Sequence, residues 1–503
     1  MKDWFKIKRY PHIGLPLTDK DRNWVEKYVK DQGKIAEHAF FPFIHREVVT
    51  RKFRKEYDSL TDEKLNSGKR NSSTKKRQIY YANHIDSNIY SYYSQLLNTL
   101  YEVELKKRHI ANVVIAYRNL KHPQKNRGMN NVDFAQEVFS FIKANTNDRL
   151  SVITFDIKNF FDNLDHDLIM KEWKKLLECD YLPRDHYNVY KNITKFSYVD
   201  IYDLFEEFKN ELLIRKNNSI ESICVSKLKY MRNKEIVAFC RLKEFNSRIR
   251  KKNLIKSNKK ELQQDGTLIP RKKGVPQGSP ISALLANLYL IEFDSKINDL
   301  ITERGGLYRR YSDDIVVVCN SADRDFFRSQ VLDGIKLYNL EIQEKKTNTF
   351  LFRRDENGYS CFKELVSGTL NTNKRFSYLG FEFDGTYVYL KSGSLSKYYR
   401  NMKHAIARGA FYAKHTNYKQ DKGKIFRRRL YKRFSYIGAK RKMIWVYDGH
   451  KWIKQHKHDW GNFLTYANMA HFNIRDSKID HQISRHWVKL NKIIKEKEDL
   501  VRI

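Results

Sequence analysis

The stretch "RRYSDDIVVV", residues 309–318, decides the fold of this chain, because it sets two aspartates side by side against an apolar, β-branched run. The run predicts a buried strand, and the residues before the aspartates predict a second short strand leading into a turn. No lysine stands nearby in the sequence, and buried carboxylates without a cation are costly. We therefore expect a metal cation at this turn, and magnesium suits carboxylate and water oxygens.

A second carboxylate site lies earlier in the chain. The run "VITFDI", residues 152–157, is short, β-branched and continuous, so it predicts a buried strand with Asp156 at its end. Asp156 together with Asp313 and Asp314 gives the set needed for two-metal phosphoryl transfer, in which the ions lie about 4 Å apart. We interpret Asp162 and Asp165, in the same segment, as cap or turn residues.

Composition narrows the class of partner. The chain has 503 residues and carries 97 Lys and Arg against 59 Asp and Glu, a formal net charge of +38. Such an excess favours a polyanionic partner, first of all nucleic acid. Five scattered cysteines without a CxxC pair argue against a disulfide framework and favour a reducing, cytoplasmic setting. The start "MKDWFKIKRY" lacks a signal peptide, and no apolar run is long enough to span a bilayer, so we expect no membrane partner.

The pattern along the chain predicts an α+β protein that is mixed in the middle and helical after Lys391. A helix should begin near Asn83, and "ISALLANLYLIEF" should form one helix with Ser279 as its cap and Pro280 in its first turn. Further expectations are a basic loop at residues 65–78, a strand at "NVVIAYRNL", a largely helical, basic stretch at about 178–262, and a hairpin turning near Asp384 and Gly385.

Five segments in order, "FDIKNFFDNLDH", "GVPQGSPISALLANLYL", "YSDDIVVV", "LEIQEKKT" and "SYLGFEF", resemble the successive palm motifs of bacterial reverse transcriptases, the branch shared with group II intron and retron enzymes. The resemblance covers roughly residues 75–389. It implies a right-hand polymerase fold. Its parts would be an N-terminal extension at 1–60, fingers at 61–150, a palm at 151–390 with a basic helical insertion at about 178–262, and a helical thumb and C-terminal region at 391–503.

The resemblance also implies residue roles in the palm. Asp156, Asp313 and Asp314 would be catalytic metal ligands, with the backbone carbonyl of Ile157 as a further ligand. Lys346 would help to protonate the departing pyrophosphate, although a slip of one residue would give this role to Lys345.

The incoming deoxynucleotide would meet Phe161, Gln277 and Gly278. Phe161 resembles a steric gate against the ribose 2′-hydroxyl, with a core phenylalanine as the alternative. Gln277 and Gly278 of "PQGSP" would lie at the nascent base pair.

Contacts to the triphosphate and to the nucleic-acid strands are also implied. Arg77 is the first candidate for the triphosphate and Lys75 a weaker one, although Tyr80 stands where the family usually has proline. Arg118 is another candidate, with a structural salt bridge as the open alternative. The hairpin with Tyr378, Leu379 and Gly380 resembles the primer grip. In "FRRRLYKRF", basic residues alternate with aromatic ones, which suits strand binding through Arg427, Arg428 and Arg429.

The chain lacks an HNH-type endonuclease segment after the palm, and it is most similar to defence-associated and abortive-infection reverse transcriptases. That resemblance implies an RNA-directed DNA polymerase in antiphage defence. It would use dNTPs and two Mg²⁺ ions, which Mn²⁺ could replace, to copy a cognate noncoding RNA into DNA, and a homo-oligomer is compatible with this. Two alternatives stay open: a template-independent or homopolymer-making nucleotidyltransferase, including one that starts on a protein hydroxyl, and a non-catalytic RNA-binding protein.

Overall fold

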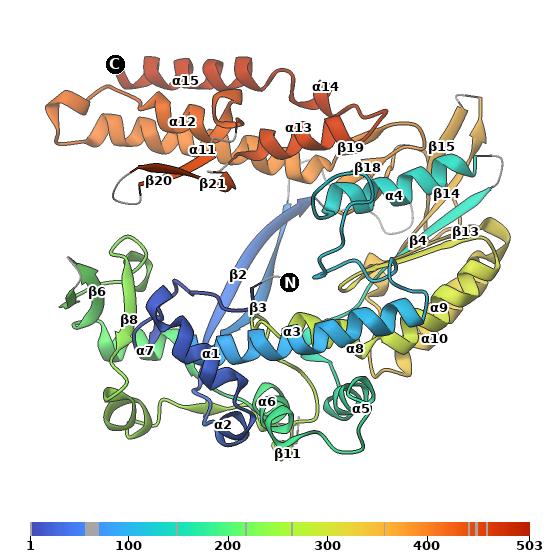
Figure 1. The fold of residues 1–503 in the computed structure, drawn as a ribbon. Helices are drawn as coiled ribbons and strands as arrows, with labels where there is room; N and C mark the ends of the chain where they lie inside the picture. Colours follow the sequence, from blue (N-terminus) through green and yellow to red (C-terminus); the bar gives the residue numbers. More distant parts are fainter. Residues whose placement is uncertain are drawn as a thin grey trace. The chain divides into compact units, whose positions relative to one another are not determined.

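The structure is a computed structural model that describes residues 3–502, except 56–69, 147–148, 217–218, 263–264, 357, 441–442, 448–450 and 459–460. The chain divides into two compact units (Figure 1). The first contains residues 1–118, 153–317 and 323–347, and the second contains 119–152, 318–322 and 348–503. No helix within the described ranges has the length and apolar character needed to cross a membrane.

The first unit holds the N-terminal half of the chain and the strands that carry Asp156 and the aspartate pair. Strands β12, β13 and β4 are neighbours in that order, and β13 and β4 continue into residues of the second unit. Its elements are β1 (His12–Ile13), α1 (Arg22–Lys30), α2 (Gln32–Glu37), β2 (Phe43–Lys55), β3 (Arg70–Tyr81), α3 (His84–Lys107), β4 (Leu150–Asp156), α5 (His166–Leu176), α6 (Arg184–Thr194), β5 (Ser197–Asp200), α7 (Ile201–Phe208), β6 (Leu212–Lys216), β7 (Ser219–Ile223), β8 (Ile236–Cys240), β9 (Lys256–Ser257), β10 (Lys260–Leu262), β11 (Leu268–Pro270), α8 (Ser282–Tyr289), α9 (Ile291–Glu303), β12 (Leu307–Tyr311), β13 (Asp314–Asn320) and α10 (Arg324–Lys336).

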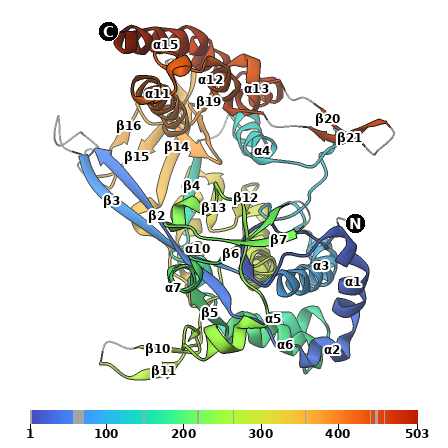
Figure 2. The ribbon, with the colours of Figure 1, turned by 90° about the vertical axis from the view of Figure 1, so that its left-hand side faces the viewer.

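Strands β2 and β3 form a long antiparallel ribbon, with Ile44 opposite Tyr81 and Lys55 opposite Arg70 (Figure 2). The predicted basic loop at 65–78 is therefore wrong from Arg70 onward, while residues 65–69 lie outside the described chain. The sequence is polar here because the described side chains from Ser72 to Arg77 are exposed. Their backbone groups are paired by β2, so a strand forms without an apolar pattern.

The insertion at 178–262 is not largely helical, which corrects the sequence prediction. It contains α6 and α7 but also six strands that lie wholly within it, β5 to β10. Its short segments "LLIRK", "SIESI" and "IVAFC" are too brief for a clear period-two signal within so basic a stretch. Two strands of the N-terminal region complete its sheets, since β1 pairs in parallel with β8 and β2 pairs in parallel with β5.

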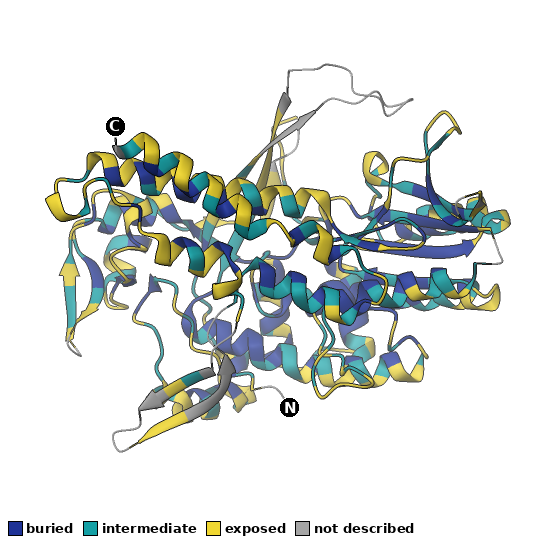
Figure 3. Cartoon of the chain, turned by 90° about the horizontal axis from the view of Figure 1, so that it is seen from above, coloured by how far each residue is buried: buried dark blue, intermediate teal, exposed yellow. Residues whose placement is uncertain are grey.

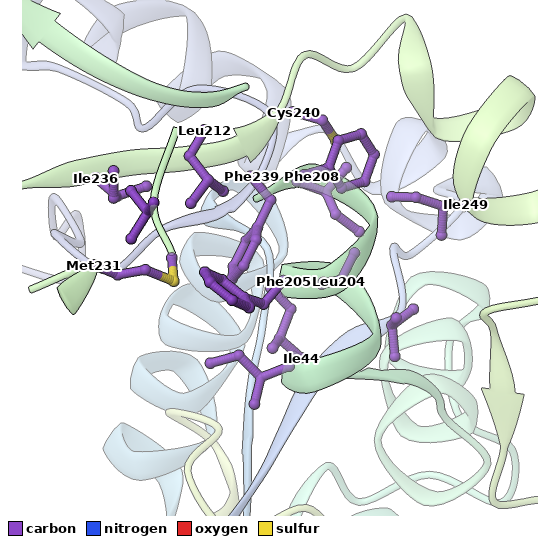
Figure 4. Packing of buried hydrophobic residues seen from close by; sticks show 14 residues of the cluster. Ile44, Leu204, Phe205, Phe208, Leu212, Met231, Ile236, Phe239, Cys240 and Ile249 are labelled. Atoms are coloured by element: carbon purple, nitrogen blue, oxygen red, sulfur yellow. The ribbon is translucent and has the colours of Figure 1, made fainter. Parts of the chain in front are cut away.

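The insertion and the N-terminal region share one hydrophobic core (Figure 4). Ile13 and Ile44 come from β1 and β2, whereas Phe205, Phe208 and Phe239 come from α7 and β8. All five side chains are buried. The extension at the start of the chain and the insertion in the middle therefore fold as one module, although about 200 residues of sequence separate their strands.

Two further local predictions are wrong. "NVVIAYRNL" is no strand; residues 113–116 are buried in turns, and a single bridge joins Val114 to Arg310. "ISALLANLYLIEF" breaks at Leu290 into α8 and α9, and α8 begins at Ser282 rather than next to a Ser279 cap. By contrast, the strand at "VITFDI", the two strands hinged at the aspartate pair, and the helix capped by Asn83 are confirmed.

The second unit carries the C-terminal helices. The predicted hairpin at Asp384 and Gly385 is confirmed, but the region after Lys391 is not purely helical, because β20 and β21 form a hairpin within it. In Figure 3, α15, which ends near the C mark, shows buried residues at intervals along a helix that is otherwise exposed or half-buried. The elements are α4 (Asn131–Ala144), β14 (Asn348–Asp355), β15 (Gly358–Glu364), β16 (Leu370–Asn371), β17 (Phe376–Tyr378), β18 (Phe381–Phe383), β19 (Val388–Leu390), α11 (Ser392–His415), α12 (Arg427–Phe434), β20 (Met443–Tyr447), β21 (Trp452–His458), α13 (Phe463–Asn473), α14 (Ile479–Ile483) and α15 (His486–Arg502).

Candidate active site

Asp156 and Asp313 meet at the ends of neighbouring strands in the first unit. Asp156 is the last residue of β4, and Asp313 stands in the turn that leads into β13. The backbone N–H of Ile157 donates a hydrogen bond to the carbonyl of Asp313 over 2.9 Å. This bond fixes the two aspartates at one sheet end, as the sequence predicts.

A lysine that the sequence places far away also reaches this site. Lys346 lies in a short 3₁₀ turn, Glu344–Lys346, and its ammonium contacts the Asp156 carboxylate. The turn is held in place because the N–H of Gln343 donates to the Asp156 carbonyl over 2.7 Å. No lysine is close to these acids in the sequence, but Lys346 is close to Asp156 in the fold. Of the two adjacent lysines, Lys345 and Lys346, it is Lys346 that makes the contact.

The electrostatics of Asp313 reflect its neighbours. Burial raises the pKa of the Asp313 carboxyl above its ordinary value, and the negative charge of Asp156 raises it further. A hydrogen bond from its own backbone and the charges of Lys75 and Lys346 act in the opposite direction. Asp314 is exposed. Within the described ranges, no three His, Cys, Asp or Glu side chains are arranged to hold a metal ion, so the structure brings together two of the three predicted carboxylates.

The turn itself rests on a buried ion pair that sequence reasoning missed. Arg310 Nε donates to Asp294 Oδ1 over 2.8 Å, and both side chains are 0% exposed. Asp294 also accepts from the hydroxyl of Tyr308. The other side of the guanidinium donates to the Ser312 carbonyl over 3.2 Å, and Ser312 has a φ of 60°. Burial works against the charge of Arg310, but Asp294 outweighs it and the pKa of Arg310 is raised.

The "PQGSP" loop is fixed against β3 by backbone contacts. The N–H of Tyr80 donates to the Gln277 carbonyl over 2.9 Å. Gly278 has a φ of 121°, and a Cβ there would lie 2.5 Å from the Tyr80 carbonyl oxygen. Only glycine allows this approach. The absence of the usual proline at Tyr80 therefore has a structural role here, because proline has no N–H to donate.

The same loop also makes a backbone contact with Phe161, the predicted steric gate. The N–H of Val275 donates to the Phe161 carbonyl over 2.9 Å, so the start of the loop lies directly on the 3₁₀ turn that carries Phe161. The Phe161 ring is only partly buried, while its neighbour Phe160 is 3% exposed and is the core residue of the two. Asp165 accepts from the N–H groups of Asp167 and Leu168 at the start of α5, which confirms its predicted capping role.

The three basic candidates of the fingers lie in different surroundings. Lys75 and Arg77 are exposed on β3, and the charge of Lys75 acts on Asp313. Arg118, by contrast, has a side chain that is 2% exposed, pairs with Glu102 and donates to the carbonyls of Ala111 and Val114. The structure thus supports the salt-bridge alternative for Arg118 and leaves no free guanidinium for a triphosphate.

The predicted primer grip forms a tight hairpin in the second unit. Tyr378 pairs with Phe381, and the two residues between them, Leu379 and Gly380, have φ values of 43° and 96°. Two positive φ angles are typical of the two-residue turns that match the twist of a hairpin. The Tyr378 ring is buried and stacks on Phe376.

The basic segment of α12 lies in the same unit, and its three arginines have different partners. Arg427 pairs with Glu498 of α15 and therefore helps to hold two helices together. Arg428 and Arg429 are exposed and have no ion-pair partner within the part of the chain that the structure describes. All three predicted strand-binding arginines are exposed, but among the described contacts only Arg427 is held by an ion pair to another helix.

Residues 237–383 match the family described as reverse transcriptase (RNA-dependent DNA polymerase). The match includes the "PQGSP" loop, the aspartate pair, Lys346 and the grip hairpin, and it begins after Asp156 because the insertion intervenes. It supports the predicted reverse transcriptase domain within these residues. The prediction of a protein with both helices and antiparallel sheets is confirmed as well. No curated protein matches the chain.

Solved structures similar to this chain include telomerases. Apo telomerase from Candida tropicalis, truncated from its C-terminal domain, has 15% identity and a TM-score of 0.33 over 72% of this chain and 57% of its own. Apo telomerase from Candida tropicalis has 12% identity and a TM-score of 0.38 over 99% and 70%. Telomerase from Candida albicans with a fragment of telomeric RNA has 12% identity and a TM-score of 0.36 over 98% and 68%. The chain thus spans little more than half of the first telomerase, and similarity at this level specifies no activity.

Replacing Arg310 with methionine should strongly destabilise the first unit. The change leaves the Asp294 carboxylate buried without its partner, which typically costs about 3–5 kcal/mol. Chemical denaturation followed by circular dichroism would measure the loss. Arg304→Met serves as the matched control, because Arg304 pairs with Asp323 on the surface and such pairs contribute about 0–1 kcal/mol. Equal losses in the two variants would contradict the assigned role of Arg310.

Gly278→Ala should abolish most RNA-directed DNA synthesis, because the added Cβ pushes the loop away from Tyr80. Gly305→Ala is the matched control: Gly305 also has a positive φ, of 68°, but nothing lies within 4 Å of a Cβ built there. The control should cost only about 1 kcal/mol of stability from backbone strain. Primer extension on an RNA template would measure both variants, and full activity in Gly278→Ala would show that the close approach is not required.

Proposed function

We propose that this protein is an RNA-templated DNA polymerase that uses Asp156 and Asp313 for metal-dependent phosphoryl transfer from dNTPs. The single observation that carries the proposal is the junction of the two strand ends, where the Ile157 N–H to Asp313 carbonyl bond brings both aspartates together. Phe161 follows Asp156 by five residues, and its carbonyl accepts from the N–H of Val275 in the loop that carries Gln277. The reverse transcriptase match includes Asp313 but not Asp156, so the geometry supplies the second acid.

The donor set fits magnesium. Asp156 and Asp313 supply carboxylate oxygens, the Ile157 carbonyl is adjacent in the chain, and Mg²⁺ takes oxygen ligands while keeping several waters. Burial raises the pKa of Asp313 most and the charge of Asp156 raises it further, and a cation would offset both effects. When bound, two such ions would activate the attacking hydroxyl and stabilise the departing oxygen. Asp314 would join the set only by turning toward Asp313, since it stands exposed on β13.

The remaining residues would position the substrate. Lys75 and Arg77 project from the exposed ribbon of β3 in the fingers, where cationic side chains can meet a triphosphate. Gln277, fixed through its own backbone to Tyr80, would contact the nascent base pair. Lys346 would leave Asp156 to donate a proton toward pyrophosphate. In the second unit, Arg428 and Arg429 of the proposed thumb would bind phosphates of the template–primer strands.

We further propose that the template is a cognate noncoding RNA and that the enzyme serves bacterial antiphage defence in the cytoplasm. The sequence resemblance supports this proposal. The module made from the N-terminal region and the insertion also supports it, because it is a separate folded part outside the proposed palm. A template-independent transferase would use the same aspartates. It is the second candidate, and the composition of the product distinguishes it from a copying enzyme.

Asp156→Asn and Asp313→Asn should each lower DNA synthesis by on the order of a thousandfold, because each removes a charge from the reacting centre. Asp165→Asn is the matched control, since asparagine caps a helix as well as aspartate does, and it should keep full activity. The assay supplies Mg²⁺ and the four dNTPs to protein purified with its own RNA. Sequencing of RNA and product completes it.

Product complementary to the bound RNA would establish templated synthesis. A homopolymer, or product that survives ribonuclease pretreatment of the protein, would instead favour the transferase. If both acid variants synthesised DNA at the wild-type rate, the assignment of Asp156 and Asp313 would be wrong.

Phe161→Ala should relax the choice of sugar. Removing the ring opens space for a 2′-hydroxyl, so the ratio of kcat/KM for a dNTP to that for the matching rNTP should fall by roughly tenfold or more. Single-nucleotide incorporation on a fixed template measures this ratio. Phe326→Ala, at an exposed position of α10, is the control. An unchanged ratio with reduced stability would identify Phe161 as a packing residue instead.

A further inference from the structure

A large cavity lies in the first unit, between the N-terminal segment and the insertion. Its volume is about 1340 Å³. Residues 7–11 and 16–19 form one wall, Arg46 and Tyr81 of the β2–β3 ribbon form another, and residues 228–237 with the start of α7 form a third. Because β1 pairs with β8 and β2 pairs with β5, all three walls are parts of one folded module.

The lining is strongly basic. Its cations outnumber its carboxylates by six to two, the carboxylates being Asp19 and Glu235. Within the described chain, Lys8, Arg46 and Arg232 have no ion-pair partner. Burial lowers the pKa of Lys8, and the charge of Lys6 lowers it further. The six cations are Lys8, Arg9, Arg46, Arg215, Lys229 and Arg232.

Aromatic rings stand among these cations. Tyr10 and Tyr81 meet edge to face with ring centroids 4.9 Å apart, and the Tyr10 hydroxyl donates to the Ala82 carbonyl over 2.8 Å. These two rings are therefore fixed. Tyr202, at the opposite wall, is 58% exposed and presents a free face. Cations that neutralise phosphates, interleaved with rings on which bases stack, are the composition of single-strand binding sites.

The apolar walls make the cavity a preformed one. Ile201, Met231 and Ile236 line it and belong at the same time to the buried core of the module (Figure 4 shows the last two). Side chains held in a packed core cannot collapse into a neighbouring space without disturbing that core. The space is therefore part of the fold.

The cavity is separate from the catalytic aspartates. Successive side chains of a strand point to opposite faces, so Tyr80 and Tyr81 face opposite sides of β3. The Tyr80 ring packs on Phe196 and Tyr198, and the charge of Asp162, which follows Phe161, acts on it. Tyr81 instead faces Tyr10 and the cavity. A ligand in the cavity would therefore not occupy the polymerase site.

We propose that this cavity binds a segment of single-stranded RNA a few nucleotides long, outside the polymerase site. Its volume exceeds the roughly 300–1,000 Å³ of small-molecule sites, which favours a strand over one free nucleotide. Asp19 and Glu235 can accept hydrogen bonds from ribose 2′-hydroxyls, which DNA lacks. Only the choice of RNA as partner rests on the proposed function.

The test compares Arg46→Gln/Arg232→Gln with a matched control, Lys296→Gln/Lys336→Gln. The control removes the same charge from exposed positions on α9 and α10. Fluorescence anisotropy with a labelled oligouridine, over a series of salt concentrations, measures the affinity of the full-length proteins. The cavity variant should bind about tenfold more weakly, with a salt slope lower by about 1.4, the value for two lost phosphate contacts on a single strand. The control should change neither.

A second pair of variants keeps the charge constant. Tyr202→Ala should weaken binding several-fold through lost stacking, whereas Tyr187→Ala, at another exposed tyrosine, on α6, should not. Photocrosslinking of a 4-thiouridine oligonucleotide should label the segments that line the cavity. If Tyr202→Ala lost as much affinity for oligodeoxythymidine as for oligouridine, the assignment to RNA would be overturned. Equal binding by the Tyr202 and Tyr187 variants would overturn the stacking site.

DNA synthesis on a preannealed RNA template and DNA primer separates this inference from the proposed function. Arg46→Gln/Arg232→Gln should keep that synthesis, because neither residue lies at the polymerase site. A protein that binds oligouridine at the cavity but makes no DNA would refute the polymerase proposal alone. A protein that makes DNA while the cavity variant binds oligouridine normally would refute the cavity site alone.

Discussion

Arg310 and Asp294 form an ion pair that is fully excluded from solvent, and the aspartate turn is built on it. The guanidinium binds the Asp294 carboxylate on one side and the Ser312 carbonyl on the other, so it connects α9 to the turn. The backbone of Arg310 also exchanges hydrogen bonds with Val113 and Ile115. Because an unpaired charge in this position would be very costly, the pair admits few alternative arrangements. The position of Asp313, and with it the junction to Asp156, follows from this constraint.

A second constraint is the pairing of strands that are far apart in the chain. The N-terminal region contributes β1 and β2 to sheets that are otherwise made by the insertion, and Ile13 and Ile44 lie in the core of that insertion. The two N-terminal side chains are buried among core residues that all come from the insertion. The insertion therefore cannot be regarded as an appendage to the palm. It forms one module with the N-terminal region. At Tyr80 of β3, the backbone N–H of this module donates to the carbonyl of Gln277 and so fixes the loop that carries it.

The sequence predicted what is encoded locally and missed what depends on long-range contacts. Asp156 and Asp313 could be found because each stands at the end of a short apolar strand, a pattern within ten residues. Lys346 could be named only by resemblance, and its contact with Asp156 spans 190 residues of chain. The buried role of Arg310 was hidden because "YRRY" reads as a surface pattern. Strand β3 was missed because its sequence shows no alternation of apolar and polar residues. Its backbone is stabilised by hydrogen bonds to β2 instead.

The charge around the site divides into a permanent part and an exchangeable part. Arg310 is 0% exposed and bound on both sides, so it cannot leave without disrupting the fold. Lys346 also neutralises an acid, but its side chain is 52% exposed and that of Asp156 is 19% exposed. A pair so accessible to water contributes little, about 0–1 kcal/mol, and can be displaced at small cost. The buried arginine therefore sets where the acids stand, while the exposed lysine pairs with Asp156 in a contact that the cation and triphosphate of the proposed mechanism would displace.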